Sequence, residues 1–339
     1  MAKELVLVTG GSGFIAVHIV VKLLERGYRV RATLRTLSRQ AEVKSMLVQG
    51  GVTDFKDLEF IQADLTSDKN WLEAATGATY VMHVAAPTPA VRPEDGDEMV
   101  KITVDGVLRV LKAAKAAGVK RVVLTSASGA VLAGHKSHPA LFTEEDWTDL
   151  SANINAYQRS KTLAEQAAWD FSKRENLELS AVNPVAVMGP VLGKDFSHSN
   201  EGIRRMLIGQ MPFLIKLGFD YVDVRDVADL HLLAMIRPEA AGERFLATAN
   251  ENISYKKLSE ILRESLGSAA GKVPTKELPD FLVRLMAKFI KDLRMTATFL
   301  GQNTACSNAK AKKLLGWQPR SAQEAIIATA KTMVEYGLV

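Results

Sequence analysis

The chain has 339 residues, of which 47% are apolar and 24% are charged. These fractions are ordinary for globular proteins and exclude disordered, collagen-like and disulfide-scaffold chains. The 43 Lys and Arg outnumber the 38 Asp and Glu by only five and are scattered along the chain, so we expect no nucleic-acid partner. The single cysteine, Cys306, and the lack of an 18-residue apolar run predict a cytoplasmic protein with no membrane partner.

The first 130 residues alternate short β-branched runs with stretches of helical period, which is typical of βαβ units. Fully apolar runs such as LVLV suit strands that are buried on both faces. The sequence therefore predicts an α/β fold with a Rossmann-type, doubly wound parallel sheet that helices cover on both sides. The expected strands are 5–9, 29–34, 58–63, 80–84 and 121–126, and the expected helices are 14–25, 39–49, 69–75 and 98–117.

The later part of the chain is less regular. A helix is expected at 157–173 and a strand at 178–183, and after residue 185 loop signals mix with helical segments until a strand returns near 245–249. We predict a Rossmann domain over 1–184, with sheet returns near 221–249, and a smaller, mainly helical C-terminal substrate lobe over 185–220 and 250–339. The amphipathic segment 281–295 is assigned to this lobe rather than to a membrane surface, and its Met and Phe residues to an apolar pocket.

A glycine-rich turn, TGGSGFIA, directly follows the first expected strand and precedes an apolar-periodic helix. In this context glycines let the backbone approach a pyrophosphate, whose charge is stabilised by the free amides and the dipole of the helix N-terminus. We therefore expect Gly10, Gly13, Phe14 and Ile15 to bind a dinucleotide.

Arg35 stands at the end of the second expected strand, where an NAD-preferring fold would place an acidic residue. A guanidinium suits a ribose 2′-phosphate, so NADP is the expected cofactor. Arg39 and Lys44 are either auxiliary cations for this phosphate or ordinary solvated side chains. Asp64 and Leu65, which close the third strand, are expected to meet the adenine.

Tyr157 and Lys161 are four residues apart and so lie one turn apart on the same helix face. A nearby ammonium favours phenolate, and we expect it to lower the pKa of the phenol toward working pH, as a proton donor to a carbonyl requires. Lys161 is also suited to bond the nicotinamide ribose. A Ser/Thr-rich strand end at 125–128 supports this reading.

Six motifs in chain order resemble an extended short-chain dehydrogenase/reductase: TGGSGFIA, HVAAP at 83–87, RVVLTSASGAV at 121–131, YQRSK at 157–161, NPVAVMGP at 183–190 and YVDVRDVA at 221–228. More narrowly, the chain is similar to the branch that contains dihydroflavonol 4-reductases, cinnamoyl-CoA reductases and microbial NADPH-dependent aldehyde and ketone reductases. This resemblance implies hydride transfer from NADPH to a carbonyl, with Tyr157 as the acid and Lys161 as the ribose binder. It also implies further cofactor contacts at Ala85, Ala86, Thr125, Pro184 and Val187.

One position departs from this family. Its members commonly read Thr-Ser-Ser at the strand end, with the second serine polarising the carbonyl, whereas this chain has Ala127 there. Ser126 and Ser128 point away from the side of residue 127 unless the strand ends between them, which Gly129 favours. We keep Ser126 and Ser128 as candidate catalytic donors, with Thr125 as a third neighbouring hydroxyl.

The expected activity is the NADPH-dependent reduction of small-molecule aldehydes, ketones or keto esters by a monomer or homodimer. Two alternatives stay open: an NAD(P)-dependent sugar-nucleotide epimerase or dehydratase, against which Arg35 counts, and a non-catalytic dinucleotide-binding regulator, against which the Tyr157 and Lys161 pair counts. No metal is expected, since His135 and His138 have no thiol or carboxylate at ligand spacing.

Overall fold

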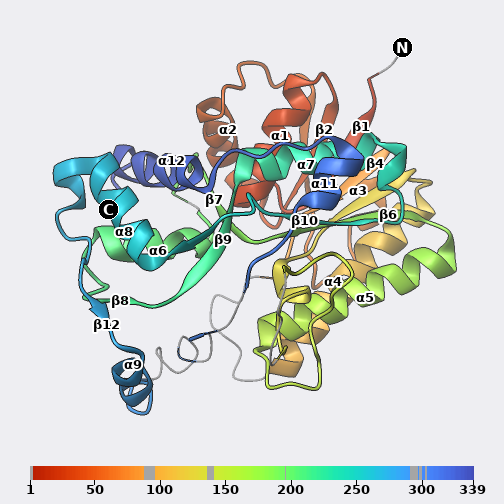
Figure 1. The fold of residues 1–339 in the computed structure, drawn as a ribbon. Helices are drawn as coiled ribbons and strands as arrows, with labels where there is room; N and C mark the ends of the chain where they lie inside the picture. Colours follow the sequence, from red (N-terminus) through yellow and green to blue (C-terminus); the bar gives the residue numbers. More distant parts are fainter. Residues whose placement is uncertain are drawn as a thin grey trace.

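A seven-stranded parallel sheet forms the centre of the computed structural model, which describes residues 3–87, 96–135, 141–194, 196–290, 297, 300–301 and 304–339 (Figure 1). Its strands are β1 (Leu5–Val8), β2 (Arg29–Leu34), β3 (Leu58–Gln62), β4 (Tyr80–His83), β5 (Arg121–Thr125), β6 (Glu178–Pro184) and β10 (Arg244–Ala247). They lie in the order β10–β6–β5–β4–β1–β2–β3, and each neighbouring pair is parallel.

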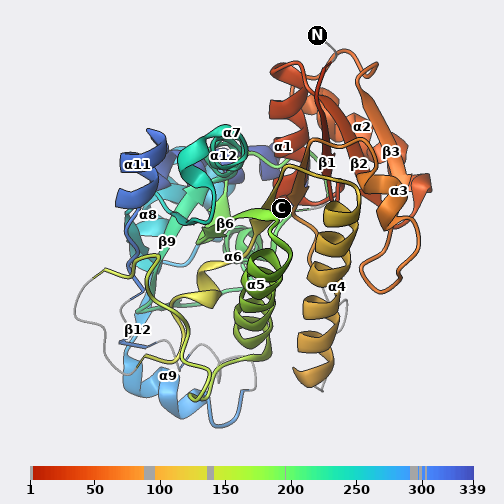
Figure 2. The same ribbon diagram turned by 90° about the vertical axis from the view of Figure 1, so that its right-hand side faces the viewer.

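Helices cover both faces of this sheet (Figure 2). On one face lie α1 (Phe14–Glu25), α2 (Gln40–Gln49) and α7 (Val224–Ile236), and on the other lie α3 (Trp71–Ala75), α4 (Gly96–Ala116) and α5 (Ala156–Glu175). Alternate residues of β1 enter the two apolar cores that result, Val6 and Val8 on the α1 face and Leu5 and Leu7 on the α4 face. The predicted α/β fold is confirmed, and each element expected before residue 184 begins and ends within two residues of its observed bounds.

The order of the strands reverses at β1, because β2 and β3 lie on one side of it and β4 on the other. Open α/β sheets bind ligands in the crevice that such a reversal leaves at the carboxyl ends of the strands. Here Thr9 joins the carboxyl ends of β1 and β4, because its hydroxyl accepts hydrogen bonds from the amides of Val84 and Ala85. The glycine-rich turn therefore lies directly beside the segment that follows β4.

The rest of the chain forms a smaller group of elements around a three-stranded sheet (Figure 1). This sheet contains β7 (Ala186–Met188), β9 (Gly218–Asp223) and β11 (Asn252–Ser254), and α6 (His198–Leu207), α8 (Tyr255–Leu266) and α12 (Ala322–Glu335) pack against it. The other elements are β8 (Leu214–Ile215), β12 (Glu277–Leu278), α9 (Asp280–Met286) and α11 (Ala309–Leu315). Two of these elements differ from the predicted division: β9 pairs with β7 rather than with the main sheet, and α11 packs on β10 and α7.

The amphipathic segment 281–295 forms a shorter helix than expected. Helix α9 ends at Met286, and residues 291–295 of the predicted helix lie outside the described residues. It packs through Val283 against Ile215 and Leu217, while Phe281 and Phe289 are 68% and 80% exposed, so these two rings do not line a pocket. No helix in the described part of the chain is long and apolar enough to cross a membrane.

Candidate active site

The turn after β1 lies closer to its neighbouring strands than side chains would allow. A Cβ on Gly10 would lie 3.0 Å from the Cα of Ala85, and one on Gly11 would lie 2.8 Å from the Cβ of Ala32. Gly10 also has a φ of +70°, which favours glycine. Glycine at both positions is therefore what allows the turn to pack between the carboxyl ends of β2 and β4.

The same turn ends at the N-terminus of α1. Gly13 is the N-cap residue and has no side chain to occupy the first-turn amides, which include those of Phe14 and Ile15. The first turn also contains no acidic residue, so nothing in it competes with an anion for the positive end of the helix. The turn fits a dinucleotide pyrophosphate, because such a group needs free amides and a close approach of the backbone.

The cations expected near the adenosine differ in their surroundings. Arg35 follows β2 directly, is exposed, and has no side-chain hydrogen bond or ion pair with any described residue. Arg39 pairs with Glu42 and also donates to the Ser12 hydroxyl in the glycine-rich turn at 3.1 Å. Lys44 lies over a ring, with its Nζ 5.5 Å from the centroid of Phe55. Arg35 therefore has the guanidinium that is most available to a phosphate.

Asp64 and Leu65 follow β3, as expected. The Asp64 carboxylate accepts hydrogen bonds from the amide and hydroxyl of Thr66, both at 2.8 Å, and these bonds, together with the charge of Arg35, lower its pKa. Leu65 packs against α4, where a Cβ on Gly106 would lie 3.1 Å from the Leu65 Cβ. The Asp64 carboxylate is thus fixed by its own turn.

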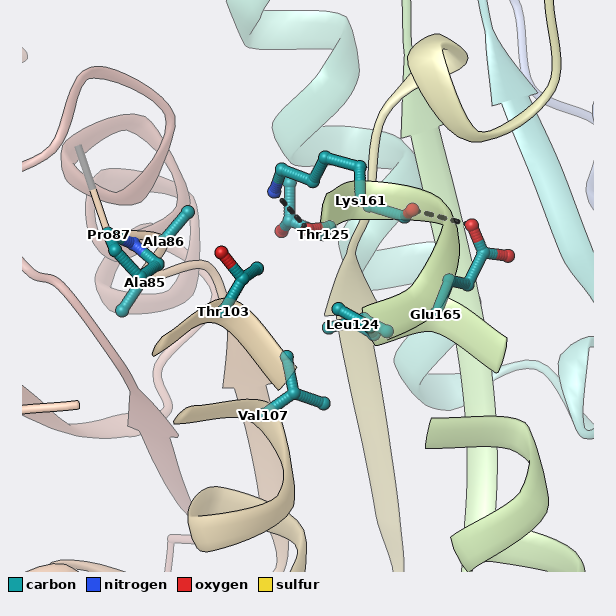
Figure 3. A pocket seen from close by; sticks show the side chains of 11 residues that line it. Ala85, Ala86, Pro87, Thr103, Val107, Leu124, Thr125, Lys161 and Glu165 are labelled. Atoms are coloured by element: carbon teal, nitrogen blue, oxygen red, sulfur yellow. Dashed lines mark hydrogen bonds between the residues drawn. The ribbon is translucent and has the colours of Figure 1, made fainter. Parts of the chain in front are cut away.

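Helix α5 carries the tyrosine and the lysine. Its start is fixed by a capping box, in which Asn155 accepts from the Gln158 amide and the Gln158 side chain accepts from the Asn155 amide. Tyr157 therefore lies in the first turn and Lys161 one turn later. The Lys161 ammonium points to the end of β5, with its Nζ 3.5 Å from the backbone oxygen of Thr125 (Figure 3).

Desolvation dominates the titration of both groups. Tyr157 is 51% exposed, yet enough protein surrounds the phenol for desolvation to raise its pKa to about 12. The expectation that Lys161 lowers this pKa is wrong for the free protein, because the ammonium turns toward Thr125. Burial lowers the pKa of Lys161 to about 8, against a smaller opposing effect of the Glu165 charge. At neutral pH the phenol therefore carries its proton and the lysine its charge.

Strand β5 ends before Ser128, and this decides on which side of the strand end the Ser128 side chain can lie. β5 stops at Thr125, Ala127 is extended, and Ser128–Ala130 forms a 3₁₀ turn that packs on α5. A Cβ on Gly129 would lie 3.6 Å from the Tyr157 Cε1, so this turn borders the phenol ring. The alternation that would direct Ser128 away from the site no longer holds beyond the strand.

The three candidate hydroxyls have different partners. His231 Nδ1 lies 2.8 Å from the Val227 carbonyl and must donate to it, so its Nε2 accepts the Thr125 hydroxyl proton at 2.7 Å. The Ser126 hydroxyl donates to a carboxylate oxygen of Glu165 at 2.5 Å. The Ser128 hydroxyl has no hydrogen-bond partner among the described residues.

A small cavity lies between the carboxyl end of β4 and helix α5. Ala85 and Ala86 line it from the end of β4, Thr125 from the end of β5, and Lys161 and Glu165 from α5 (Figure 3). Ala85 also lies against the glycine-rich turn, so one residue borders both this turn and the cavity beside Lys161.

The remaining predicted contacts lie on later strands, and the residues that sequence reasoning missed lie on helices α5 and α7 and on strands β6 and β10. Pro184 closes β6 and Val187 is the middle residue of β7, and both are buried. Sequence reasoning missed Glu165, although it continues the helix face of Tyr157 and Lys161 by one more turn. It also missed Arg244, Asn183 and His231, for which the sequence carries no local signal.

Comparisons with known proteins identify the family of the chain. The profile of the NAD dependent epimerase/dehydratase family matches residues 6–247. Cinnamoyl-CoA reductase 1 of Arabidopsis thaliana is 37% identical over 250 residues, which cover 73% of this chain and 71% of the relative. Ketoreductase azaE of Aspergillus niger is 30% identical and is covered to 98%, with 99% of this chain.

Solved structures are similar over the whole length. The yeast methylglyoxal/isovaleraldehyde reductase Gre2, crystallised with NADPH, is 28% identical with a TM-score of 0.81, over 99% of this chain and 100% of Gre2. The family profile matches from β1 to the end of β10, and the similarity to Gre2 covers nearly the whole chain. The chain belongs to the NAD dependent epimerase/dehydratase family, the extended branch of the short-chain dehydrogenases/reductases.

Proposed function

We propose that this protein is an NADPH-dependent carbonyl reductase that converts aldehydes, ketones or keto esters to alcohols. The observation that carries the proposal is that Lys161, one helical turn after Tyr157, reaches the carboxyl end of β5 across a cavity from Ala85, which lies against the glycine-rich turn. The turn that begins at Ser128 borders the Tyr157 ring, and the Ser128 hydroxyl has no hydrogen-bond partner among the described residues. The curated relatives reported above are reductases, and the Gre2 complex contains NADPH, which supports the cofactor.

The cofactor site follows from the residues described above. The amides of Gly13, Phe14 and Ile15 would hold the pyrophosphate, and Gly10 would allow its approach. Arg35 would bond the 2′-phosphate, since its guanidinium is exposed and unpaired within the described residues. When bound, NADPH supplies the hydride that adds to the carbonyl carbon of the substrate.

Further cofactor contacts are proposed where the fold brings residues to the same crevice. Ala85, Ala86 and Thr125 line the cavity beside Lys161. Pro184 and Val187 follow on the next strand and on the small sheet. Lys161 would bond the nicotinamide ribose, and Asp64, Leu65 and Lys44 would border the adenosine.

Tyr157 would donate the proton. The phenol is protonated at neutral pH, so it can transfer a proton to the carbonyl oxygen as negative charge develops there. The phenol then regains its proton from solvent before the next turnover.

Ser128 is the hydroxyl that we assign to the substrate oxygen. The proton of Thr125 is directed to His231, and that of Ser126 to Glu165, so neither is available to a carbonyl. Ser128 begins the turn that borders the Tyr157 ring. A donor so placed would stabilise the developing oxyanion together with the phenol.

The substrate would bind against the smaller lobe. We propose that residues 185–220 and 250–339 form this lobe and that residues 1–184 hold the cofactor, in a monomer or homodimer. The residues proposed for the chemistry, Tyr157 and Ser128, both lie in residues 1–184. The proposed role of the lobe is therefore to select which carbonyl compounds fit.

The direct test follows NADPH absorbance with a panel of aldehydes, ketones and keto esters, with NADH in parallel and a UDP-sugar as a probe of epimerase activity. We expect NADPH consumption with at least one carbonyl and none with the UDP-sugar. Tyr157→Phe should abolish turnover while NADPH still binds. Consumption by no carbonyl would refute the reductase function, and an active Tyr157→Phe would refute the assigned proton donor.

A further inference from the structure

The carboxylate of Glu165 is buried beneath the proposed site. Glu165 follows Lys161 by four residues and Tyr157 by eight, so all three lie on one face of α5. Its side chain is 0% exposed, and the proposed mechanism gives it no role. A buried charge of this kind requires partners that compensate for its desolvation.

Four donors from four places in the fold surround this carboxylate. One oxygen, Oε2, accepts from the Ser126 hydroxyl at 2.5 Å and from Asn183 Nδ2 at 2.7 Å. The other, Oε1, accepts from Arg244 Nε at 2.6 Å and Trp169 Nε1 at 3.2 Å. Amide, indole and guanidinium nitrogens can only donate, so Glu165 acts throughout as an acceptor. It joins α5 to the ends of β5, β6 and β10.

Arg244 is itself held firmly. Its Nη1 donates to the backbone oxygens of Glu144 and Asp146 at 2.9 and 3.0 Å, and its guanidinium stacks 3.7 Å above the ring of Trp147. The planar fork of an arginine, fixed on three sides, leaves little freedom to the carboxylate that it binds. Arg244, on strand β10, therefore fixes the position of the Glu165 carboxylate.

The three residues before Ser128 are each hydrogen-bonded to Glu165, to its partner Asn183 or to Lys161. The Thr125 oxygen accepts from Lys161 (Figure 3). The Ser126 hydroxyl donates to Glu165, and the Ala127 oxygen accepts from Asn183 at 3.2 Å. The last two ties meet at the same carboxylate oxygen, because Asn183 also donates to it. The distance between Ser128 and the helix of Tyr157 is thus set through Glu165.

Glu165 also supplies the negative charge near Lys161. His83 on β4 and Tyr157 and Glu165 on α5 are the titratable neighbours of this ammonium, and burial keeps His83 neutral with a pKa lowered to about 3. α4 and β5 contribute to the shared cavity Thr103, Val107, Leu124, Thr125 and Ser126, which carry no charge. Glu165 alone of these groups raises the pKa of Lys161 against its desolvation.

We propose that Glu165 is a positioning residue of the reductase site: it holds the Ser126–Ser128 segment against α5 and balances the charge of Lys161. The inference rests on the proposed reductase function for its kinetic consequences. The hydrogen bonds of Glu165 and its charge predict separate effects, which separate experiments can measure.

The first experiment is a double-mutant cycle on kcat with Ser126→Ala and Glu165→Gln in the purified full-length protein. A misplacement of about 1 Å in a catalytic group can cost about 100-fold in rate, so we expect Glu165→Gln to lose about 100-fold and Ser126→Ala about tenfold. Because Ser126 is proposed to act only through its hydrogen bond to Glu165, the double variant should be no slower than Glu165→Gln. Losses that multiply would overturn the proposal and indicate direct contact of Ser126 with substrate.

Arg121→Gln serves as the matched control. Arg121 is a buried arginine at the opposite end of β5, where it pairs with Glu178 and donates to the backbone oxygens of Ala234, Met235 and Arg237. Its loss should lower Tm while kcat stays within about twofold, as expected for a purely structural ion pair. An equal loss of kcat in this control would attribute the Glu165 effect to stability and would overturn the proposal. If Glu165→Gln does not fold, Asn183→Ala replaces it in the cycle.

The second experiment needs no turnover. NMR titration of the protein labelled with ¹³C at lysine Cε, with Lys161 assigned by its absence in Lys161→Met, should give a lower midpoint for Lys161 in Glu165→Gln than in the wild type. An unchanged midpoint would overturn the charge role. Should the wild type consume no NADPH, the reductase function fails while this titration still decides the link between Glu165 and Lys161.

Discussion

Replacement of Ser128 by alanine tests the assignment of the oxyanion donor most directly. The change removes one hydroxyl that has no hydrogen-bond partner among the described residues, so no buried group loses a partner. Ser128 is the first residue of a 3₁₀ turn whose backbone bonds, from the amides of Val131 and Leu132 to the Ser128 oxygen, do not involve its side chain. Ser128→Ala should therefore fold and melt as the wild type does.

The expected loss in rate is large. Removal of a single oxyanion donor costs about 2.7–4 kcal/mol in the transition state, which corresponds to a decrease in kcat of about 100- to 1000-fold. The KM for the carbonyl should change much less, because the hydroxyl binds the charge that develops and not the neutral carbonyl.

Thr125→Val is the matched control because its hydroxyl belongs to a different bond. The variant leaves the buried Nε2 of His231 without its donor, which should cost about 1–3 kcal/mol of stability. Its kcat should remain within about threefold of the wild type. Steady-state kinetics with NADPH and thermal unfolding, run on both variants, separate the two patterns.

Two results would refute this reasoning. If Ser128→Ala keeps wild-type kcat, Ser128 does not touch the substrate oxygen. If Thr125→Val loses 100-fold in kcat without loss of Tm, the Thr125 hydroxyl is the donor and its bond to His231 is broken when substrate binds.

Three further predictions concern the lysine and the cofactor. Lys161→Met should abolish turnover yet raise the free energy of unfolding at pH 7 by about 3 kcal/mol, because burial lowers the folded pKa from 10.5 to about 8. The cost of burying the charged lysine in the wild type is complete below pH 8 and vanishes above 10.5. In urea unfolding, the stability advantage of Lys161→Met over the wild type should therefore be smaller at pH 10.5 than at pH 7; an equal advantage at both pH values would contradict this prediction. Arg35→Leu should lower kcat/KM for NADPH about 10- to 100-fold and leave NADH unchanged, as expected for a lost charge-assisted bond, and equal losses with both cofactors would exclude a 2′-phosphate contact. Gly10→Ala should prevent NADPH binding, measured by fluorescence, whereas Gly118→Ala, with a similar φ of +69° but open space around its Cβ, should reduce only stability; equal NADPH binding by the two variants would show that the close approach to Ala85 is not needed.

The sequence alone was sufficient for the order of elements in the first 184 residues. Alternating apolar runs and stretches of helical period act within a few residues of the chain, so the sequence shows them directly. The irregular later part was harder. Residues 221–249 were expected to belong with the main sheet and no strand was predicted over 218–223. Only the pairing of β9 with β7, whose residues lie more than thirty positions earlier, assigns β9 to the small sheet.

The candidate site divides in the same way. The glycine-rich turn, Arg35 after its strand, and the Tyr157 and Lys161 spacing follow from local sequence, because a strand-turn-helix unit and one helical turn fix where these side chains lie. The choice among Thr125, Ser126 and Ser128 did not follow, since it depends on His231, 106 residues away from Thr125, and on Glu165, 39 residues away from Ser126. Arg244, 79 residues from Glu165, decides that a carboxylate can be buried there at all. The sequence by itself determined that Tyr157 and Lys161 share one helix face. Only the tertiary structure decided which of the three hydroxyls has no hydrogen-bond partner among the described residues, because long-range hydrogen bonds leave no periodic trace in the chain.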